Sequence, residues 1–182
     1  MDSATRFLWE RPFRDLTVTE LMAGTPLSRP AFYTYFTDLH ELVETLLGDV
    51  EAVMHATAHP WVSGEGEPLA ALLESQRGVV LTCLDHGPIF RAVAEAAPLD
   101  ERLEQTWAAF TKRWDDVVEA RIEAQQADGL IRKSLDAKRI ANALNTMDTG
   151  LLLAEFGRRP QGDPEAVLGA MHEVWSRTLY GG

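Results

Sequence analysis

Helix signals recur along the whole chain and strand signals are almost absent, which constrains the fold more than any other feature of the sequence. Apolar residues recur at helical spacing between short stretches that contain proline or glycine. These breaks lie at residues 60–68, 86–88, 98, 128–129 and 160–164. The pattern predicts an all-α protein. The helices of its C-terminal part are expected at residues 69–85, 100–126, 136–156 and 164–180, with a short one at residues 89–96.

The composition is that of a globular protein. The chain has 182 residues, of which 46% are hydrophobic, so it can bury a substantial core in one or two domains. Its single cysteine, Cys83, excludes an internal disulfide framework, which is typical of a reducing cytoplasm. No apolar run reaches the roughly 18 to 20 residues that span a bilayer, and no signal-peptide pattern opens the chain. We therefore expect a cytoplasmic protein with no membrane partner.

Two short helices joined by a tight turn are predicted near the N-terminus. Thr17 and Glu20 have the spacing of a capping box, in which the hydroxyl serves a first-turn amide and the carboxylate reaches back to the cap. Residues 24–27 break this helix. Ser28 can cap a second helix with Pro30 in its first turn, where a missing N–H costs little. This is the geometry of a helix-turn-helix, whose second helix enters the major groove of DNA.

The second short helix has a buried side and an exposed side. Phe32 and Phe36 are four residues apart and should both face the core. The residues that are left outward are Arg29, Pro30, Tyr33 and Thr34. An outward arginine and tyrosine suit phosphates and base edges. A second capping box, Asp38-x-x-Glu41, starts a long connecting helix over residues 37–57, and a polar loop is expected at residues 59–68.

The run Leu16–Phe36, followed by Leu42, Leu46 and Leu47, resembles the DNA-binding domain of the TetR family of bacterial transcriptional regulators. The resemblance implies an all-helical homodimer of about nine helices. It implies a helix-turn-helix DNA-binding domain at residues 1–48 and a ligand-binding and dimerisation domain at residues 49–182. A double-stranded DNA operator and a hydrophobic small-molecule effector would then be the partners, with no cofactor.

The same resemblance assigns the DNA contacts. Base contacts fall at Arg29, Pro30 and Tyr33, phosphate contacts fall at Thr34 and Tyr35, and Ser28 caps the helix. The chain differs from the family pattern at Pro26, where a glycine is usual, and at Leu39, where a lysine usually contacts phosphate. It also opens without the basic lead-in of the family's first helix, which implies a short first helix.

The charge of the N-terminal residues is unusual for a DNA-binding domain. Residues 1–50 contain four arginines, no lysine and eight acidic residues, so their net charge is −4. Much of the affinity for DNA comes from neutralising phosphates. DNA binding therefore requires the few cations to gather on one face, and these are Arg6, Arg11, Arg14 and Arg29. The net charge of −11 for the whole chain argues against a general nucleic-acid coat protein.

An aromatic stripe marks the longest expected helix. Trp107, Phe110 and Trp114 are spaced three and four residues apart, which places three large rings on one helix face. Ordinary core packing is the plain interpretation. Asn145 and Asp148 form a polar pair on another helix, and a few polar groups in an apolar pocket orient a ligand. The alternative for this pair is a polar contact between helices or between subunits.

The C-terminal two-thirds resembles one branch of the TetR family, whose members enclose a hydrophobic tunnel that accepts extended apolar ligands. The shared motifs are Arg11-Pro12, Ser28-Arg29-Pro30, Trp107-x-x-Phe110-x-x-x-Trp114, Ala143-Leu144-Asn145-x-Met147 and Val174-Trp175. The resemblance implies a ligand site that includes Trp107, Trp114, Asn145 and Trp175. Phe110 shares their helix face, and the acid Asp148 could favour a ligand with an amine or a hydroxyl group.

The last two expected helices each carry an apolar stripe, and the family pairs these helices with their copies in a dimer. The stripes are Ile140, Leu144, Met147 and Leu151 on one helix, and Val167, Leu168, Met171, Val174 and Trp175 on the other. Each offers more apolar surface than one side of a small bundle needs. The alternative is that both stripes are buried within the monomer.

Enzymatic and metal sites have little support in the sequence. His55 and His59 are four residues apart, but a zinc site needs three or four ligands. No phosphate-binding loop, nucleophile elbow or catalytic triad spacing is found. Asp100-Glu101 and Asp115-Asp116 are interpreted as solvated acids, and Cys83 as an inert core thiol. We therefore expect a ligand-responsive repressor. The alternative is a helical small-molecule-binding or partner-binding protein of the same fold that has lost DNA binding.

Overall fold

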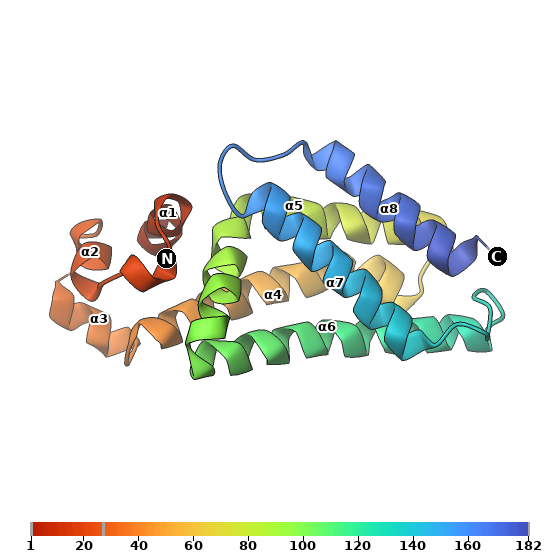
Figure 1. Ribbon diagram of the computed structural model, residues 1–182, viewed down its shortest axis with the longest axis horizontal. Helices are drawn as coiled ribbons and strands as arrows, with labels where there is room; N and C mark the ends of the chain where they lie inside the picture. The colour runs from red at the N-terminus through yellow and green to blue at the C-terminus, as the bar shows by residue number, and fades with distance from the viewer. Residues whose placement is uncertain (1, 27, 182) are drawn as a thin grey trace.

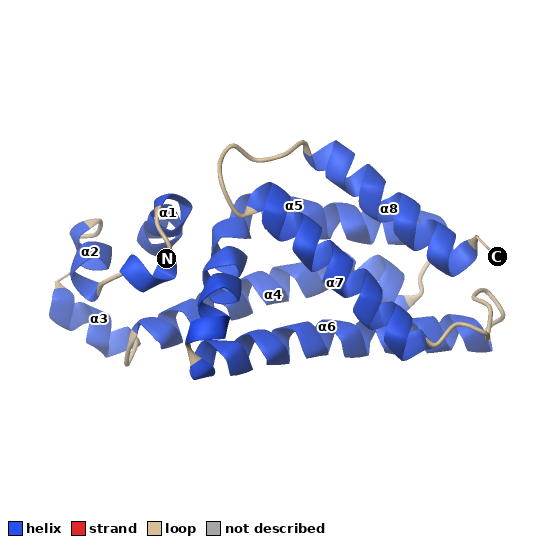
Figure 2. Ribbon diagram, in the orientation of Figure 1, coloured by secondary structure: helices blue, strands red, loops and turns tan. Residues whose placement is uncertain are grey.

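The computed structural model describes residues 2–26 and 28–181, and this part of the chain is all-α, as predicted. It contains eight α-helices, two short 3-10 helices and no strand, against the nine or so helices expected (Figure 2). The α-helices are α1 Asp2–Glu10, α2 Val18–Ala23, α3 Arg29–Tyr35, α4 Leu39–Ser63, α5 Pro68–Ala96, α6 Glu101–Ala127, α7 Ala137–Phe156 and α8 Pro164–Tyr180. The 3-10 helices are η1 Phe13–Asp15 and η2 Ala97–Leu99.

The short helices α1, α2 and α3 lie together at one end of the molecule, and α4 leads from them into a bundle with α5 to α8 (Figure 1). Within the bundle α4 packs mainly on α5, and α6 packs mainly on α7. The expected domain boundary after residue 48 lies inside α4, so one helix belongs to both parts. A movement of α4 in the bundle would therefore move the short helices.

The buried core is continuous between the two parts. Leu8 of α1 and Phe32 of α3 belong to the same buried cluster as Val43 of α4 and Val93 of α5. Arg91 of α5 is only 6% exposed, and its Nη2 donates to the main-chain carbonyl of Leu8. The last carbonyls of a helix have no partner within that helix. Arg91 therefore satisfies the end of α1 and fixes it on the bundle.

Two of the predicted helix caps are confirmed, and a third is incomplete. Thr17 Oγ1 accepts from the Glu20 N–H at 3.1 Å, and Asp38 Oδ1 accepts from the Glu41 N–H at 2.8 Å. Ser28 occupies the N-cap position of α3 with an extended backbone, but within the described chain its hydroxyl makes no cap hydrogen bond. α3 therefore starts without the amide partner that was expected from Ser28.

The loop predicted at residues 59–68 is wrong for its first half, because α4 continues through Pro60 to Ser63. Proline removes one helix hydrogen bond and crowds the preceding turn. Ser75 of α5 compensates for the disturbance, since its Oγ accepts from the Trp61 N–H and donates to the Ala58 carbonyl, both at 3.0 Å. This partner lies on another helix, so the sequence around Pro60 does not reveal it.

The break predicted at residues 86–88 is also wrong, because α5 is a single helix. The Gly87-Pro88 pair bends the helix instead of ending it, and the ribbon of α5 turns sharply in its second half (yellow-green to green in Figure 1). Gly87 and Pro88 are both buried. The residues on either side pack in one core, which keeps the bent helix continuous. The helices predicted at 100–126, 136–156 and 164–180 correspond closely to α6, α7 and α8.

Candidate functional site

The outward face of α3 presents the predicted DNA-contact residues to solvent. Phe32 is 3% exposed and packs on Phe36 with ring centroids 5.5 Å apart, so the predicted core side is confirmed. Tyr33 and Tyr35 are 52% and 71% exposed. The other exposed residues of this predicted set are Ser28, Arg29, Pro30 and Thr34. Exposed tyrosines on a short helix at the end of a molecule are available for a partner, and their contact with DNA stays a prediction.

Acidic side chains neutralise some of the N-terminal arginines. Arg11 pairs with Glu20, and it also lies 3.9 Å from Asp15. The Glu20 carboxylate was expected to reach back to the cap, but it accepts from Arg11 and from the Thr17 hydroxyl instead. Arg29 has no salt bridge among the described residues. Arg29 is thus the arginine that α3 can offer to a phosphate or a base.

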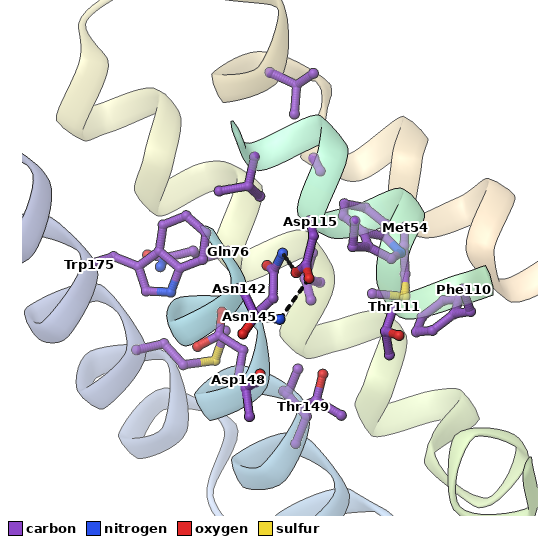
Figure 3. Close-up of a pocket in the computed structure, with 18 of the residues that line it drawn as sticks. Met54, Gln76, Phe110, Thr111, Asp115, Asn142, Asn145, Asp148, Thr149 and Trp175 are labelled. Carbon is purple, nitrogen blue, oxygen red and sulfur yellow. Dashed lines mark hydrogen bonds between the residues drawn. The ribbon is translucent and has the colours of Figure 1, made fainter. Parts of the chain in front are cut away.

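A cavity of about 310 Å³ lies inside the bundle between α4, α5, α6, α7 and α8 (Figure 3). Its volume is at the lower end of the range typical of small-molecule sites. All the predicted ligand residues line it, and these are Trp107, Phe110, Trp114, Asn145, Asp148 and Trp175. The structure thus brings together the residues that the sequence pattern grouped. Ligand binding by them stays a prediction.

Aromatic rings form much of the cavity wall. Trp107 and Phe110 stack with centroids 5.3 Å apart, and Trp114 stacks on His55 of α4 at 4.4 Å. Trp175 meets Trp61 edge to face at 5.6 Å. Phe110 is buried, whereas Trp107 and Trp114 are partly exposed. The stripe therefore lines a space that an apolar ligand can fill.

One predicted solvated acid lies in this cavity, so its interpretation is wrong. Asp115 lines the cavity and accepts from the Nδ2 of Asn142 and the Nδ2 of Asn145, both at 2.8 Å (Figure 3). Asp116 is exposed and pairs with Lys112, as expected of a solvated acid. Asp115 directly follows Trp114 and lies four residues after Thr111, and this spacing on the aromatic face is the signal that could have identified it.

Four polar atoms of residues that line the cavity are buried and have no hydrogen-bond partner among the described residues: Gln76 Nε2, Trp114 Nε1, Trp175 Nε1 and Asp148 Oδ1. Gln76 was missed because it is a single polar residue of α5. It is 5% exposed, and its Oε1 accepts from His172 Nδ1 at 3.0 Å. Buried polar groups are nearly always paired with protein, water or ligand. The cavity therefore offers donors and an acceptor to a bound molecule.

Burial changes the titration of two groups near the cavity. It raises the pKa of the Asp148 carboxyl to about 7, and the Trp175 side chain acts in the opposite direction. It also raises the pKa of the Cys83 thiol to about 12, with a further contribution from the Asp148 charge. Cys83 is buried, so the expectation of an inert core thiol holds.

Polar contacts connect the start of α6 with the start of α4. Arg102 of α6 donates from Nε to Glu44 Oε1 at 2.9 Å and from Nη1 to Asp38 Oδ2 at 3.0 Å. Asp100 was predicted to be a solvated acid, but it caps α6 and accepts from His40 Nε2 at 2.7 Å. The cap hydrogen bonds from the Glu41 N–H and the Leu103 N–H are the largest cause of the lowered pKa of the Asp38 and Asp100 carboxyls, and the contacts with Arg102 and His40 lower it further. The Arg102 hydrogen bond is the largest cause of the lowered pKa of Glu44. The helix that carries the aromatic stripe is thus held to the helix that follows α3.

The apolar stripes of the last two helices are mostly part of the monomer core. Leu144, Val167, Leu168, Met171 and Trp175 are buried, whereas Val174 is 41% exposed. The alternative interpretation therefore holds for these five buried side chains. The exposed positions of both helices include small residues, which are Ala143, Gly150 and Ala154 on α7 and Ala166, Gly169 and Ala170 on α8. Charged residues such as Arg139, Glu173 and Arg177 are exposed on the same two helices.

Neither a metal cluster nor a membrane span is found in the described chain. No three metal-ligating side chains come together among residues 2–26 and 28–181. His55 is engaged in stacking on Trp114. None of the helices described for this chain is long and apolar enough to cross a bilayer.

Comparison with known proteins shows where the chain has relatives. The sequence model of the family described as "Transcriptional regulator EthR, C-terminal domain" matches residues 73–181. The chain is also similar to the HTH-type transcriptional regulator EthR of Mycobacterium tuberculosis. The two are 28% identical over 187 residues, which cover 98% of this chain and 84% of the relative.

Solved structures share the fold over nearly the whole chain. A TetR-family transcriptional regulator from Syntrophomonas wolfei has a TM-score of 0.81 at 14% identity, covering 97% of this chain and 90% of that chain. The structure of AibR in complex with isovaleryl coenzyme A and operator DNA has a TM-score of 0.71 at 17% identity, covering 98% and 94%. At such identities the likeness concerns the fold alone.

Proposed function

Since this chain belongs to the EthR branch of the TetR family of transcriptional regulators, we propose that it binds a palindromic operator as a homodimer and is released by a hydrophobic small molecule. The observation that carries the DNA-binding part is the exposed face of α3, with Tyr33 and Arg29 above the buried Phe32. Residues 1–48 would read the operator, and residues 49–182 would bind the effector and the second subunit.

The cavity is the proposed effector site. Residues of five helices line it, five aromatic side chains are among them, and several of its buried polar atoms have no partner among the described residues. The AibR structure contains both isovaleryl coenzyme A and operator DNA, so a related fold holds a small molecule together with DNA. An apolar molecule that fills this cavity would contact Trp107 and Trp114 of α6.

A route from the cavity to α3 runs through α6 and α4. Trp107 lies just over one helical turn after Arg102, and Arg102 holds Asp38 and Glu44 at the start of α4. A ligand that displaces α6 would therefore shift α4 and with it α3. Such a shift releases DNA only if the ligand has a higher affinity for the arrangement that does not fit the operator.

The proposed dimer uses the outer face of α7 and α8. Two-fold symmetry would place two copies of α3 on two half-sites, whose spacing the dimer fixes. Small residues let helices approach closely, and a Cβ added at Gly150 or Gly169 would meet no atom within 4 Å. This open face can accept the same face of a second copy.

DNA binding is tested first with the DNA around the protein's own gene, by mobility shift and footprinting with excess competitor. We expect a protected palindrome. Arg29→Ala and Tyr33→Ala should each weaken operator binding at least about tenfold, because each removes a contact at a base edge. Arg132→Ala, a change at an exposed arginine after α6, is the matched control and should bind normally. Normal operator binding by both α3 variants would refute the assignment of α3 as the reader.

The acidic N-terminal part supports a second candidate, a ligand-binding or partner-binding protein of this fold without specific DNA binding. Four arginines stand against eight acids in residues 1–50, and Leu39 replaces the usual lysine. Salt separates the two candidates. Specific DNA binding should weaken steeply as salt rises, because counterions are released. Binding of an apolar ligand in the cavity should hardly change. No protected site at any salt concentration would favour the second candidate.

A further inference from the structure

The charge in the cavity points to the chemical class of the effector. Its lining has two ionisable side chains, Asp115 and Asp148, and both are acids. None of the described residues that line it is lysine, arginine or histidine. Buried acids in proteins are normally paired with a cation or with several donors. The protein itself therefore provides no positive charge that would complete this site.

The two acids differ in their partners. Asp115 already accepts from Asn142 and from Asn145, one bond at each carboxylate oxygen. Asp148 has a buried Oδ1 without a hydrogen bond of good geometry in the described chain, and the Trp175 indole is the donor close enough to lower its pKa. A group that donates to this oxygen would remove the cost of an unmade hydrogen bond. A positively charged donor would form the stronger, charge-assisted bond.

The walls of the cavity also favour a cation. Tryptophan faces attract ammonium groups, most strongly where water is excluded. Trp107, Trp114 and Trp175 all line the space that Asp148 enters. Three further donors have no partner in the described chain, Gln76 Nε2, Trp114 Nε1 and Trp175 Nε1, and they suit an oxygen or a π-system elsewhere on the same molecule. A cavity of about 310 Å³ has room for an apolar body besides the charged group.

We propose that the effector is an apolar molecule with a protonated amine, and that its ammonium group binds between Asp148 and the tryptophan faces. The proposal rests on the proposed function only in taking the cavity as the effector site. The ionised carboxylate of Asp148 and the protonated amine are the bound forms. No covalent step is involved.

The test uses two probes with one carbon skeleton, 6-phenylhexylamine and 6-phenylhexan-1-ol, which differ in an ammonium and a hydroxyl group. Each is titrated into the full chain at about pH 7.5, without DNA, and binding is followed by calorimetry. We expect the amine to bind at least about tenfold more tightly than the alcohol. Equal binding, or tighter binding of the alcohol, would overturn the proposal.

Two variants separate the site from the overall negative charge of the chain. Asp148→Asn keeps the shape of the side chain but cannot ionise, and it should lose the preference for the amine. Asp116→Asn removes an exposed acid that pairs with Lys112 outside the cavity, and it should keep the preference. If Asp148→Asn still prefers the amine, the preference comes from the net charge of −11 and not from Asp148. This result would refute the proposed site.

A measurement on the unmodified chain covers the case in which Asp148→Asn does not fold. Amine affinity should rise between about pH 6 and pH 8, since Asp148 ionises in this range while the amine stays protonated. The other titratable groups around Asp148 and Gln76 are Cys83 of α5, Asp115 of α6 and His172 of α8. The alcohol probe experiences the same three groups and serves as the reference. An amine affinity that does not rise relative to the alcohol would contradict the proposal.

The readout also separates this proposal from the proposed function. Probe binding is measured on the protein alone, so it does not depend on an operator. If the amine is preferred but no operator is found, the ligand class stands and the regulatory function fails. If an operator is found and only the alcohol releases it, the regulator stands and the amine proposal fails.

Discussion

At the scale of single residues, Asp148 is expected to make the stability of the fold depend on pH. Its pKa is about 7 in the folded chain, against an ordinary value of 3.8. Between these two values the folded state binds more protons than the unfolded state, so the free energy of unfolding falls as pH rises through this window. A shift of this size corresponds to about 4 kcal/mol at most.

Replacing Asp148 by asparagine removes this titration while it keeps the shape of the side chain. Urea unfolding at about pH 4.5 and pH 8 should show that the unmodified chain loses stability relative to Asp148→Asn as pH rises. Cys83, Asp115 and His172 are common to both proteins, so the difference isolates Asp148. Asp116→Asn should show no such difference, because Asp116 is exposed. A parallel pH dependence of the unmodified chain and Asp148→Asn would contradict the raised pKa.

Single residues also show what the sequence could and could not reveal about the site. Trp107, Phe110 and Trp114 were predictable because helical spacing alone places them on one face. The position of Asp115 beside the aromatic face could be read from its spacing, but its hydrogen bonds could not, because its partners Asn142 and Asn145 come from a different helix. A side chain whose environment is set by tertiary contacts looks, in the sequence, like any other charged residue near a helix surface.

At the scale of helices, Gly87 is expected to be essential where α5 crosses α7. A Cβ at this position would fall far inside van der Waals contact with the main-chain carbonyl of Phe156, the last residue of α7. Backbone cannot move aside as a flexible side chain can, so Gly87→Ala should lower the free energy of unfolding by about 1–3 kcal/mol. Thermal or urea unfolding measures the change.

Gly48 of α4 is the matched control, since a Cβ there would meet nothing within 4 Å. Gly48→Ala should therefore raise the free energy of unfolding by up to about 1 kcal/mol, through helix propensity alone. If Gly87→Ala is as stable as Gly48→Ala, the close approach of α5 and α7 is wrong.

The helices themselves were predictable where local chemistry decides and unpredictable where packing does. Thr17 and Asp38 cap their own first turns, so the starts of α2 and α4 could be read from a few residues. Pro60 and the pair Gly87-Pro88 are strong local signals for a break. Their helices continue because Ser75 and the buried core supply partners from elsewhere in the chain.

At the scale of the whole molecule, the proposed dimer depends on the outer face of α7 and α8, which would hold two copies of α3 at the spacing of two half-sites. Most of the larger apolar side chains of α8 are buried in the monomer, and the small residues Ala166, Gly169 and Ala170 are exposed beside charged ones. We expect Gly169→Arg to fold normally, because the added side chain has open space in one chain. In a dimer the same side chain would lie between two packed helices, where a bulky charge is costly.

Light scattering after size-exclusion chromatography should therefore give a dimer for the unmodified chain and a monomer for Gly169→Arg. Gly48→Arg adds the same charge and bulk at an open glycine of α4 and should stay dimeric. Operator binding should fall for Gly169→Arg, since one α3 alone contacts only one half-site. A dimeric Gly169→Arg would move the interface to another face. If the unmodified chain is a monomer, it has no second α3 with which to contact both half-sites. This outcome would favour the candidate that does not bind DNA.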